Sequence, residues 1–459
     1  MIIFKNALVI TMDSKHRVIK NGAVAVEGKY IKEVGKTDSL CTKWPKAKII
    51  DANNHIILPG FINAHTHLFQ VLLRGIGDDL SLTEWLKKAI WPLSKYIKRE
   101  ESYLATLLAS AEMIRSGITT FVDSHYITID KKCYDGIAQA VEEIGNRGVI
   151  GRSTVDSPLV PTEFREPVNI AVKEACRVID NYHLKAEGRI KVRVEPLNES
   201  LASKEMILAM RKVSKDYGIG FSMHVEEIKS RTERCHKDYG YPPIEWLYKL
   251  GVLGPDVLLS HCVWANPKEI DLLRETDTRV VYNPVCNQYL GDGIAPILKM
   301  LEKGITVAIA TDGAATNNNQ NIFEAMKSGA LLQKVSTLDA GALSAQKALE
   351  MVTIDAARAI GMEDKIGSLE KEKYGDLVLI NLETPQLVPL ASVLSNIVYA
   401  APANAVDLVM VNGSIIFDKG EIVTFNQKQI IKKCNEKVES MLSSIGINDL
   451  INRGEWKVL

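Results

Sequence analysis

The feature that most constrains the fold is a series of eight short apolar runs, each followed by a stretch in which hydrophobic residues recur at helical spacing. Runs that are apolar at consecutive positions are typical of strands buried on both faces, as in a parallel sheet. The runs span residues 55–67, 117–125, 148–155, 189–197, 219–227, 256–264, 278–287 and 305–313. Eight strand–helix units over about 250 residues are the size of a (β/α)8 barrel. We therefore predict an α/β protein with a TIM barrel over residues 57–369.

The two ends of the chain differ from the middle. Residues 1–56 and the later segments 375–383 and 405–423 alternate apolar and polar residues between Gly and Asn turns, which is typical of antiparallel strands. Because the same pattern stands at both ends, we predict one small β-sandwich domain built from residues 1–56 and 370–459.

Charge and cysteine usage exclude several classes of protein. Lys plus Arg and Asp plus Glu both number 56, so the formal net charge is zero. A protein that binds nucleic acid mainly through phosphates normally carries a basic excess. No run of eighteen apolar residues is present, so we predict no membrane span. The seven cysteines are scattered and form no Cys-x-x-Cys pair, which favours a reducing, cytoplasmic location.

The histidines are few, and four of the nine fall near the carboxyl ends of predicted strands. His65 and His67 end the first strand, His224 the fifth and His261 the sixth, and Asp312 follows the eighth. Barrel enzymes build their active sites at this end of the strands, and residues i and i+2 of a strand point the same way. A lone histidine is more often satisfied by packing, but five such residues on four strand ends favour a shared ion. Imidazole with carboxylate suits Zn(II) or Fe(II).

Two carboxylates near these histidines each allow two interpretations. Glu227 lies three residues after His224, either as a surface group or as a general acid/base beside the metal. Its closeness to the predicted metal site favours the second interpretation. Asp312 is in a position to cap a following helix, but its place at the end of the buried run ITVAIAT favours a ligand.

Four motifs together resemble the amidohydrolase superfamily: PGFINAHTH at 59–67, HVEE at 224–227, SHCVW at 260–264 and TDGAATNN at 311–318. More narrowly, they resemble its branch of methylthioadenosine/S-adenosylhomocysteine deaminases, guanine deaminases, melamine deaminase and atrazine chlorohydrolase. The likeness covers nearly the whole chain and implies a metal-dependent hydrolase with a TIM barrel.

The resemblance implies one divalent metal, zinc or iron, bound by His65, His67, His224 and Asp312. Binuclear members carry a carboxylated lysine at the end of the fourth strand, where this chain has Glu195, so a mononuclear centre is expected. The same resemblance implies that Asp312 accepts a proton from the attacking water, that His261 orients this water, and that Glu227 protonates a ring nitrogen of the substrate.

The resemblance also suggests four substrate-binding residues: Gln70, Glu84, Trp85 and Arg152. The segment LSLTEWL at 80–86 matches the methylthioadenosine deaminases, in which the glutamate corresponding to Glu84 holds ribose hydroxyls and an arginine aligns with Arg152. Gln70 stands where guanine deaminases and atrazine chlorohydrolase carry glutamine, and Trp85 either lines the pocket or belongs to the scaffold. The alternatives are a Glu84 favoured by a helix dipole and an Arg152 at the surface. The stretch Gly-Pro-His-Ser of the adenosine-type deaminases, whose histidine contacts the purine, is replaced here by 195–198, Glu-Pro-Leu-Asn.

We therefore predict an aminohydrolase that releases ammonia from an amino-substituted nitrogen heterocycle, namely a nucleobase, nucleoside, pterin or aminotriazine. The TDGAATNN loop resembles the deaminases, and Gly313 stands where the chlorohydrolase has an amide. The alternative is an s-triazine hydrolase that releases chloride or an alkylamine. A non-catalytic scaffold protein is disfavoured because the complete ligand set is present. Relatives commonly form dimers or larger assemblies, so a homo-oligomer, a dimer or tetramer, is expected.

Overall fold

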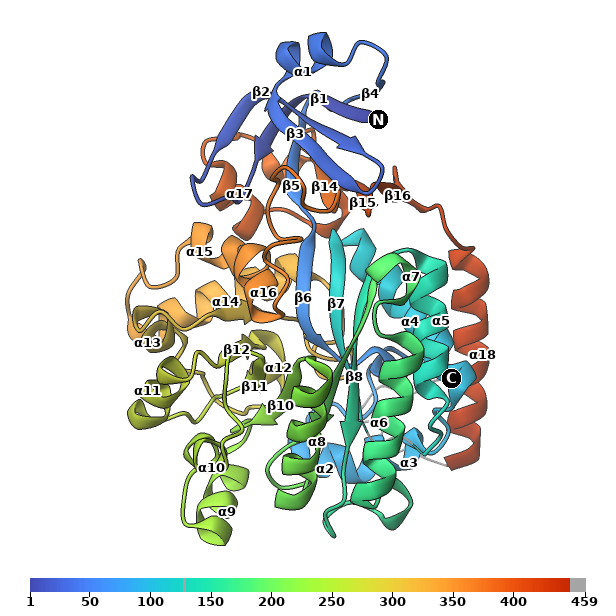
Figure 1. Cartoon of the computed structure of the whole chain (residues 1–459), viewed down its shortest axis with the longest axis vertical. Coiled ribbons are helices and arrows are strands. Elements are labelled where there is room, and N and C mark those ends of the chain that lie inside the picture. The colour runs from blue at the N-terminus through green and yellow to red at the C-terminus, as the bar shows by residue number, and fades with distance from the viewer. Residues whose placement is uncertain (127–128, 446–459) are drawn as a thin grey trace, which may run out of the picture.

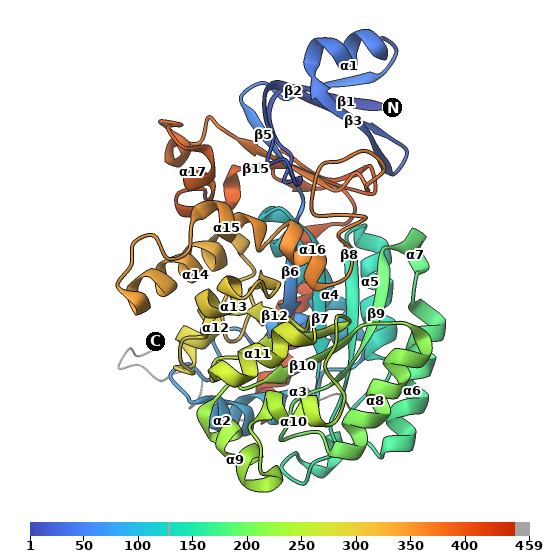
Figure 2. The ribbon, with the colours of Figure 1, turned by 60° about the vertical axis from the view of Figure 1, so that its left-hand side comes forward.

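A computed structural model describes residues 1–126 and 129–445. Eight parallel strands form a near-closed barrel in the order β13-β12-β11-β10-β9-β8-β7-β6, with helices around its outside (Figures 1 and 2). The strands are β6 Phe61–Thr66, β7 Ile118–His125, β8 Arg147–Thr154, β9 Ile190–Pro196, β10 Phe221–Val225, β11 Val257–His261, β12 Arg279–Tyr282 and β13 Val307–Ile309. Each of the eight predicted runs overlaps one of these strands along nearly its whole length, so the predicted fold class is confirmed.

Burial on both faces is the reason why these runs form barrel strands. Every residue of β7 and of β8 is buried, on the inner and the outer face alike. The first and last strands approach each other through residues at their ends. The backbone N–H of Asp312 donates to the carbonyl of His65 at 3.1 Å, and that of Thr311 donates to Oδ1 of Asn63 at 3.0 Å. This closure brings the end of β13 beside the histidines of β6.

The longer helices lie around the outside of the barrel, and several of them begin or end at ordinary capping residues. They are α4 Arg99–Arg115, α5 Cys133–Ile144, α6 Val168–Tyr182, α8 Lys204–Tyr217, α9 Lys229–Tyr239, α11 Pro267–Glu275, α14 Ile322–Thr337 and α18 Gln427–Ile445. As one example, Ser203 Oγ accepts from the N–H of Met206 at the start of α8. Gly218 ends the same helix with φ +63°, a conformation that suits glycine. Among the described residues, no helix has both the length and the apolar character needed to cross a bilayer.

Shorter helices lie in the connections. They are α1 Thr37–Lys43, η1 Leu68–Leu73, α2 Leu82–Trp85, η2 Leu86–Ile90, α3 Trp91–Ser94, η3 Thr162–Phe164, α7 Lys185–Gly188, α10 Pro243–Lys249, α12 Pro284–Tyr289, α13 Ile297–Glu302, α15 Ala345–Glu350, α16 Ile354–Ala359, η4 Pro385–Leu387, α17 Val393–Tyr399 and η5 Ala403–Ala405. Of these, α2 and η2 follow the first barrel strand, and they cover the cavity described below.

Strands from both chain ends form one mixed sheet beside the barrel (Figure 1, top). They are β1 Ile2–Ile10, β2 Val18–Glu27, β3 Tyr30–Lys36, β4 Lys48–Asp51, β5 His55–Pro59, β14 Leu377–Asn381, β15 Val406–Val411, β16 Ser414–Asp418 and β17 Glu421–Ile422. The two ends meet where β5 pairs antiparallel with β14, with Ile57 opposite Leu379. Both residues belong to one buried apolar cluster that also includes Phe4, Val24 and Met410.

The sheet and the barrel are joined by a buried ion pair. Arg147 at the start of β8 lies 3.0 Å from Asp376, which precedes β14, and both side chains are almost completely buried. By contrast, α18 leaves the sheet and packs against α4 of the barrel, as its contacts and Figure 1 show. The domain boundaries at 56 and 370 stay predictions, and residues 446–459 of the predicted second domain lie outside the described part of the chain.

Candidate metal centre

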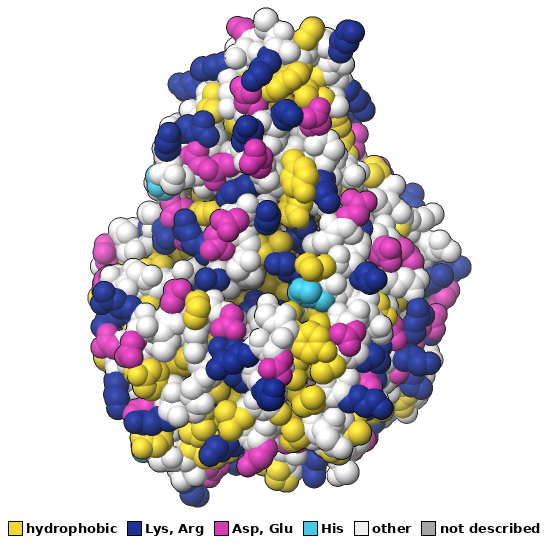
Figure 3. All heavy atoms as spheres, in the orientation of Figure 1, with side chains coloured by type: hydrophobic (Ala, Val, Ile, Leu, Met, Phe, Trp, Pro, Cys, Tyr) yellow, Lys and Arg dark blue, Asp and Glu magenta, His cyan; other side chains and the backbone are white. Residues whose placement is uncertain are grey.

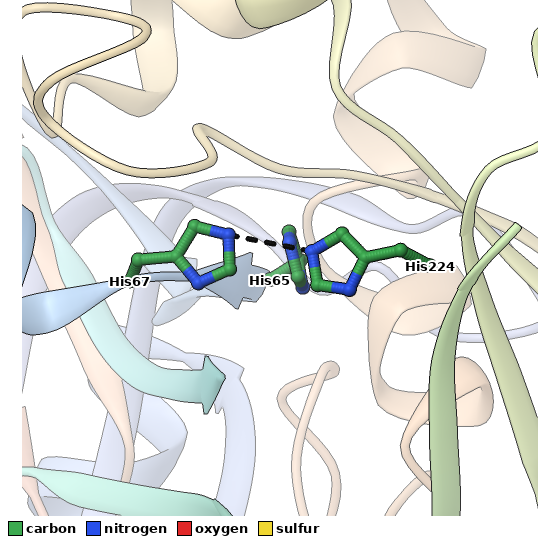
Figure 4. A group of neighbouring side chains, drawn as sticks. All are labelled: His65, His67 and His224. Carbon is green, nitrogen blue, oxygen red and sulfur yellow. Dashed lines mark hydrogen bonds between the residues drawn. The ribbon is translucent and has the colours of Figure 1, made fainter. Parts of the chain in front are cut away.

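The four predicted metal ligands meet at the carboxyl ends of the barrel strands. Nε2 of His67 lies 3.3 Å from Nε2 of His224 and 3.2 Å from Oδ1 of Asp312. Nε2 of His65 lies 3.8 Å from the same carboxylate oxygen. Figure 4 shows the rings of His67 and His224 pointing toward each other with His65 beside them. One ring nitrogen from each of these three histidines lies within 4.8 Å of the others.

Hydrogen bonds of the Nδ1 atoms of His67 and His224 show which nitrogen of each ring carries the hydrogen. Nδ1 of His67 lies 2.7 Å from the carbonyl of Ser124, and Nδ1 of His224 lies 3.2 Å from the carbonyl of Leu197. A carbonyl only accepts, so in the neutral rings Nδ1 carries the hydrogen and Nε2 presents a lone pair. Two lone pairs that face each other at 3.3 Å repel, and a cation between them removes the repulsion.

A third ring supports the same conclusion. Nε2 of His65 is buried and has no hydrogen-bond partner in the described part of the chain, and burial lowers the pKa of His65 well below its usual value. Its Nδ1 lies 3.2 Å from the hydroxyl of Ser260, which is able to accept the ring hydrogen and leave Nε2 with a lone pair toward the cluster. Three imidazole nitrogens and one carboxylate form a donor set that fits a single Zn(II) or Fe(II) ion.

Glu195 stands where binuclear relatives carry a lysine, and its position is that of a supporting group. Its Oε1 lies 3.4 Å from Nδ1 of His224. That nitrogen is on the side of the ring away from the cluster and is hydrogen-bonded to the carbonyl of Leu197, so Glu195 lies behind His224 and not among the grouped ligand residues. A carboxylate behind a ligating histidine commonly fixes the orientation of the ring.

His261 differs from His67 and His224 in its tautomer. Its Nδ1 lies 3.0 Å from the amide nitrogen of Asn287 and 3.4 Å from that of Asn283. Because an amide nitrogen donates, Nδ1 accepts and Nε2 carries the hydrogen. This Nε2 faces Oδ2 of Asp312 at 3.6 Å and Oε1 of Glu227 at 3.8 Å. His261 is therefore a hydrogen-bond donor beside the cluster.

Glu227 is held beside His261 by an arginine. Its Oε2 lies 2.6 Å from Nη1 of Arg231, and its side chain is 9% exposed. Burial raises the pKa of Glu227, but the charges of His261 and Arg231 outweigh burial and hold this pKa below its usual value. Glu227 is consequently a carboxylate at neutral pH and able to accept a proton.

The backbone turns sharply where the site residues stand. Glu226, His261 and Asp312 have φ values of +54°, +78° and +63°. Non-glycine residues rarely adopt this left-handed region, and such strain concentrates at functional sites. Here the turns end the strands and direct the side chains of His261 and Asp312 into the cluster.

A narrow cavity adjoins the cluster and contains two of the predicted substrate-binding residues. Gln70 and Trp85 line it, and Gln70 is fixed because its Nε2 donates to the hydroxyl of Tyr126 at 2.9 Å. A Cβ atom on residue 313 would lie 1.9 Å from Oε1 of Gln70. Gly313 therefore leaves the space that the Gln70 amide occupies.

Glu84 and Arg152 lie outside this cavity lining. Glu84, on α2, is half exposed and lies 3.0 Å from Lys88. Arg152, in β8, is 2% exposed and lies 2.7 Å from Glu166. It is thus a buried side chain rather than a surface one. Contact of either residue with substrate stays a prediction.

Several lining residues were missed by the sequence analysis. They are Leu82, Leu86, Tyr126, Leu201, Arg231, Cys286 and Thr316. Arg231 had a usable signal, because it stands four residues after Glu227 on the helix that follows β10. Tyr126 directly follows the second barrel strand, and its position at a strand end was a weaker signal.

Comparison with known proteins agrees with this geometry. The Amidohydrolase family matches residues 56–416. A 5-methylthioadenosine/S-adenosylhomocysteine deaminase of Syntrophomonas wolfei is 37% identical over 96% of this chain and 99% of its own length. A 5'-deoxyadenosine deaminase of Methanosarcina acetivorans is 36% identical over 96% of this chain and 98% of its own. The crystal structure of an adenosine deaminase from Xanthomonas campestris with bound zinc matches with a TM-score of 0.91 and 27% identity, covering 96% of this chain and 98% of that one. The chain belongs to the amidohydrolase family.

Proposed function

We propose that this protein is a metal-dependent deaminase of adenosine-type nucleosides, which replaces the amino group of the purine by oxygen and releases ammonia. The observation that carries the proposal is the position of Glu227, whose carboxylate lies 3.8 Å from the N–H of His261 at the edge of the metal cluster. An amino group leaves only after it is protonated, so the reaction needs a proton carrier at this place. Relatives that match nearly the whole chain are deaminases of this nucleoside class.

When bound, a divalent cation held by His65, His67, His224 and Asp312 supplies Lewis acidity that activates water for attack. Asp312 accepts a proton from the attacking water, and Nε2–H of His261 orients this water and stabilises the developing charge. Glu227 takes up the other proton of this water and delivers it to the ring nitrogen next to the carbon under attack. The proton held by Asp312 then reaches the amino group by way of Glu227, the amino group leaves as ammonia, and the carbon keeps the oxygen of the water.

The lining residues suggest how a purine is recognised without the histidine of the relatives. Leu197 and Asn198 both line the cavity. Oδ1 of Asn198 accepts from the backbone N–H groups of Ser200 and Leu201 at 3.0 and 2.9 Å, which turns its amide nitrogen into the group offered to substrate. We assign Asn198 as the donor to a purine nitrogen and Leu197 as an apolar contact.

The cavity next to the cluster offers only about 40 Å³, and ligand pockets of drug size are about 300 Å³ or more. Entry of a nucleoside therefore requires a wall to move. The wall that contains Leu82, Trp85 and Leu86 belongs to α2 and η2. Glu84 stands on the same wall, and its movement would give this carboxylate access to the ribose hydroxyls.

The finer assignments follow the same reasoning. Zinc is the proposed metal because the Xanthomonas campestris structure holds zinc, with one ion per chain because Glu195 does not bridge. All seven cysteines are unpaired, which supports a cytoplasmic location. A dimer or tetramer stays a prediction.

One paired assay tests the proposal. Ammonia release is measured from 5'-methylthioadenosine, S-adenosylhomocysteine, 5'-deoxyadenosine and adenosine, and from guanine, aminopterins and aminotriazines. Chloride release is measured in parallel from matched chlorinated rings. We expect kcat/KM to be highest for an adenosine-type nucleoside. Faster turnover of the chlorinated rings, with no ammonia from any aminated compound, would establish the s-triazine hydrolase instead.

A further inference from the structure

A second cavity, of about 380 Å³, lies at the opposite end of the barrel from the metal centre. It is lined by residues at or before the starts of β9, β10, β11 and β12 and by the residues that end α16. The histidine cluster stands at the other ends of these strands, so the two cavities are separated by the length of the barrel core. Figure 3 shows the surface hollowed beside α16 below the mixed sheet, with Lys and Arg side chains at the margin.

The lining of this cavity carries an excess of positive charge. Lys191, Arg193 and Arg279 line it, and the one carboxylate in the lining is Asp256. Asp256 is already paired with Arg211, whose Nη2 donates to it at 2.8 Å. The charge of this carboxylate is thus compensated by a cation outside the lining.

The three lining cations have no ion-pair partner among residues 1–126 and 129–445. Arg193 is 4% exposed, and its Nη2 donates only to the carbonyls of Phe221 and Asp256, at 3.1 and 3.2 Å. Arg279 donates only to the carbonyl of Arg358. Nε of both guanidinium groups is buried without a hydrogen-bond partner. An unpaired charge as deeply buried as that of Arg193 is costly, because charged side chains in protein interiors are normally paired, whereas Lys191 and Arg279 are partly exposed.

The local backbone is shaped to hold Arg193 in this place. A Cβ atom on residue 220 would lie 2.7 Å from Nε, Cζ and Nη2 of Arg193. Gly220 therefore leaves the room in which the guanidinium lies at the start of β10. Burial lowers the pKa of Arg193 to about 10, and Arg279 acts in the same direction, so Arg193 is still charged at neutral pH.

We propose that this cavity is a binding site for a small phosphorylated molecule, distinct from the deaminase site. Guanidinium groups are suited to phosphate because their N–H donors match its oxygens in pairs, and two guanidiniums with one ammonium compensate a dianion. The volume exceeds what inorganic phosphate fills, and Val149, Val192 and Ile219 supply an apolar wall. The ligand is thus a phosphate ester with an organic group.

Calorimetric titration of the zinc-loaded protein with inorganic phosphate, pyrophosphate and glycerol phosphate tests the proposal, with chloride at matched ionic strength as the reference. We expect phosphate compounds to bind at one site per chain. Arg279→Gln and Lys191→Gln should each weaken binding about tenfold or more, as loss of a charged hydrogen bond commonly does. Ammonia release should be unchanged in both variants, because neither residue touches the deaminase site. Lys432→Gln, which changes an exposed lysine on α18, is the matched control and should bind as the unmodified protein does.

A thermal measurement separates this cavity from the metal centre and requires no substitution of the buried Arg193. At about a hundredfold excess over Kd, phosphate should raise Tm by about 3 °C. The shift should persist in His224→Asn, which lacks a metal ligand, and vanish in the Lys191→Gln/Arg279→Gln double variant. Absence of any shift above the chloride reference, a shift lost in His224→Asn, or a shift retained in the double variant would each overturn the proposal.

Discussion

Replacing Glu227 by glutamine separates its chemistry from its place in the fold. The glutamine has nearly the same shape, and its carbonyl oxygen can still accept from Arg231. In the unmodified protein, Nη1 of Arg231 lies 2.6 Å from Oε2 of Glu227. The metal cluster keeps all its donors, since Glu227 is not among the grouped ligand residues. What disappears is a group that takes a proton from water and gives it to the substrate.

The expected loss of kcat in Glu227→Gln follows from the proton transfers assigned to Glu227. Positioned acid/base groups contribute about 10²- to 10⁴-fold to rate, which corresponds to about 3–5 kcal/mol of activation free energy. Glu227 serves both the ring nitrogen and the leaving amino group, so we expect a loss of kcat near the upper end of this range. KM should change little, because the substrate contacts of the side chain are retained in shape.

The assay is ammonia release from the best nucleoside, with zinc content measured on the same sample. Arg231→Gln is the matched control: it breaks the same ion pair but keeps the carboxylate. Since Arg231 lowers the pKa of Glu227, this control should shift the acid limb of kcat/KM to higher pH and retain more turnover than Glu227→Gln. Turnover of Glu227→Gln within tenfold of the unmodified protein, at full zinc content, would refute the role of Glu227 as proton carrier.

Three other predictions concern the metal, pH and stability. Chelation should abolish ammonia release and added zinc should restore it at one ion per chain; two tightly bound ions by metal analysis would contradict the mononuclear centre. Burial lowers the pKa of His125 to about 3. As the pH falls below about 6.5, His125 is therefore protonated in the unfolded chain but not in the folded one, and the free energy of unfolding decreases. His125→Asn should remove about 2 kcal/mol of the loss between pH 7 and 5 in denaturant unfolding, and an unchanged pH dependence would exclude this group. Asp376→Asn should lower the free energy of unfolding by about 3–5 kcal/mol, because it leaves the fully buried Arg147 unpaired; a loss under 1 kcal/mol would show that the pair does not hold the sheet to the barrel.

The barrel and the grouping of the candidate ligands could be predicted because both depend on short-range patterns. Runs buried on both faces need no distant partner to be recognised, and the ligands stand at the ends of such runs. His65 lies in β6 and His67 follows that strand in extended conformation, so the two side chains, two residues apart, point the same way. The meeting of β6 with β13 then follows from closing eight parallel strands, and Asp312 arrives beside the histidines.

The contacts that join distant segments could not be predicted in the same way. Arg147 and Asp376 are 229 residues apart, and no local pattern links a barrel strand to the second half of the composite sheet. The burial of Arg152 also depends on an ion pair with a residue outside its own strand. Its partner Glu166 lies in the loop after β8, and with this pairing Arg152 is buried and does not take the alternative position at the surface.

The different roles assigned to the four histidines could not be predicted from local sequence patterns either. All four stand at strand ends, and their side chains are chemically identical. Which ring nitrogen binds a cation and which donates a proton is decided by the partner of the other nitrogen. Backbone carbonyls leave His67 and His224 with a lone pair toward the cluster. The amide of Asn287, 26 residues further along the chain, leaves His261 with an N–H there. In the proposed assignment, the metal-binding histidines and the water-orienting His261 therefore differ through their neighbours, and substitution of Asn287 by aspartate should convert His261 toward the ligand tautomer.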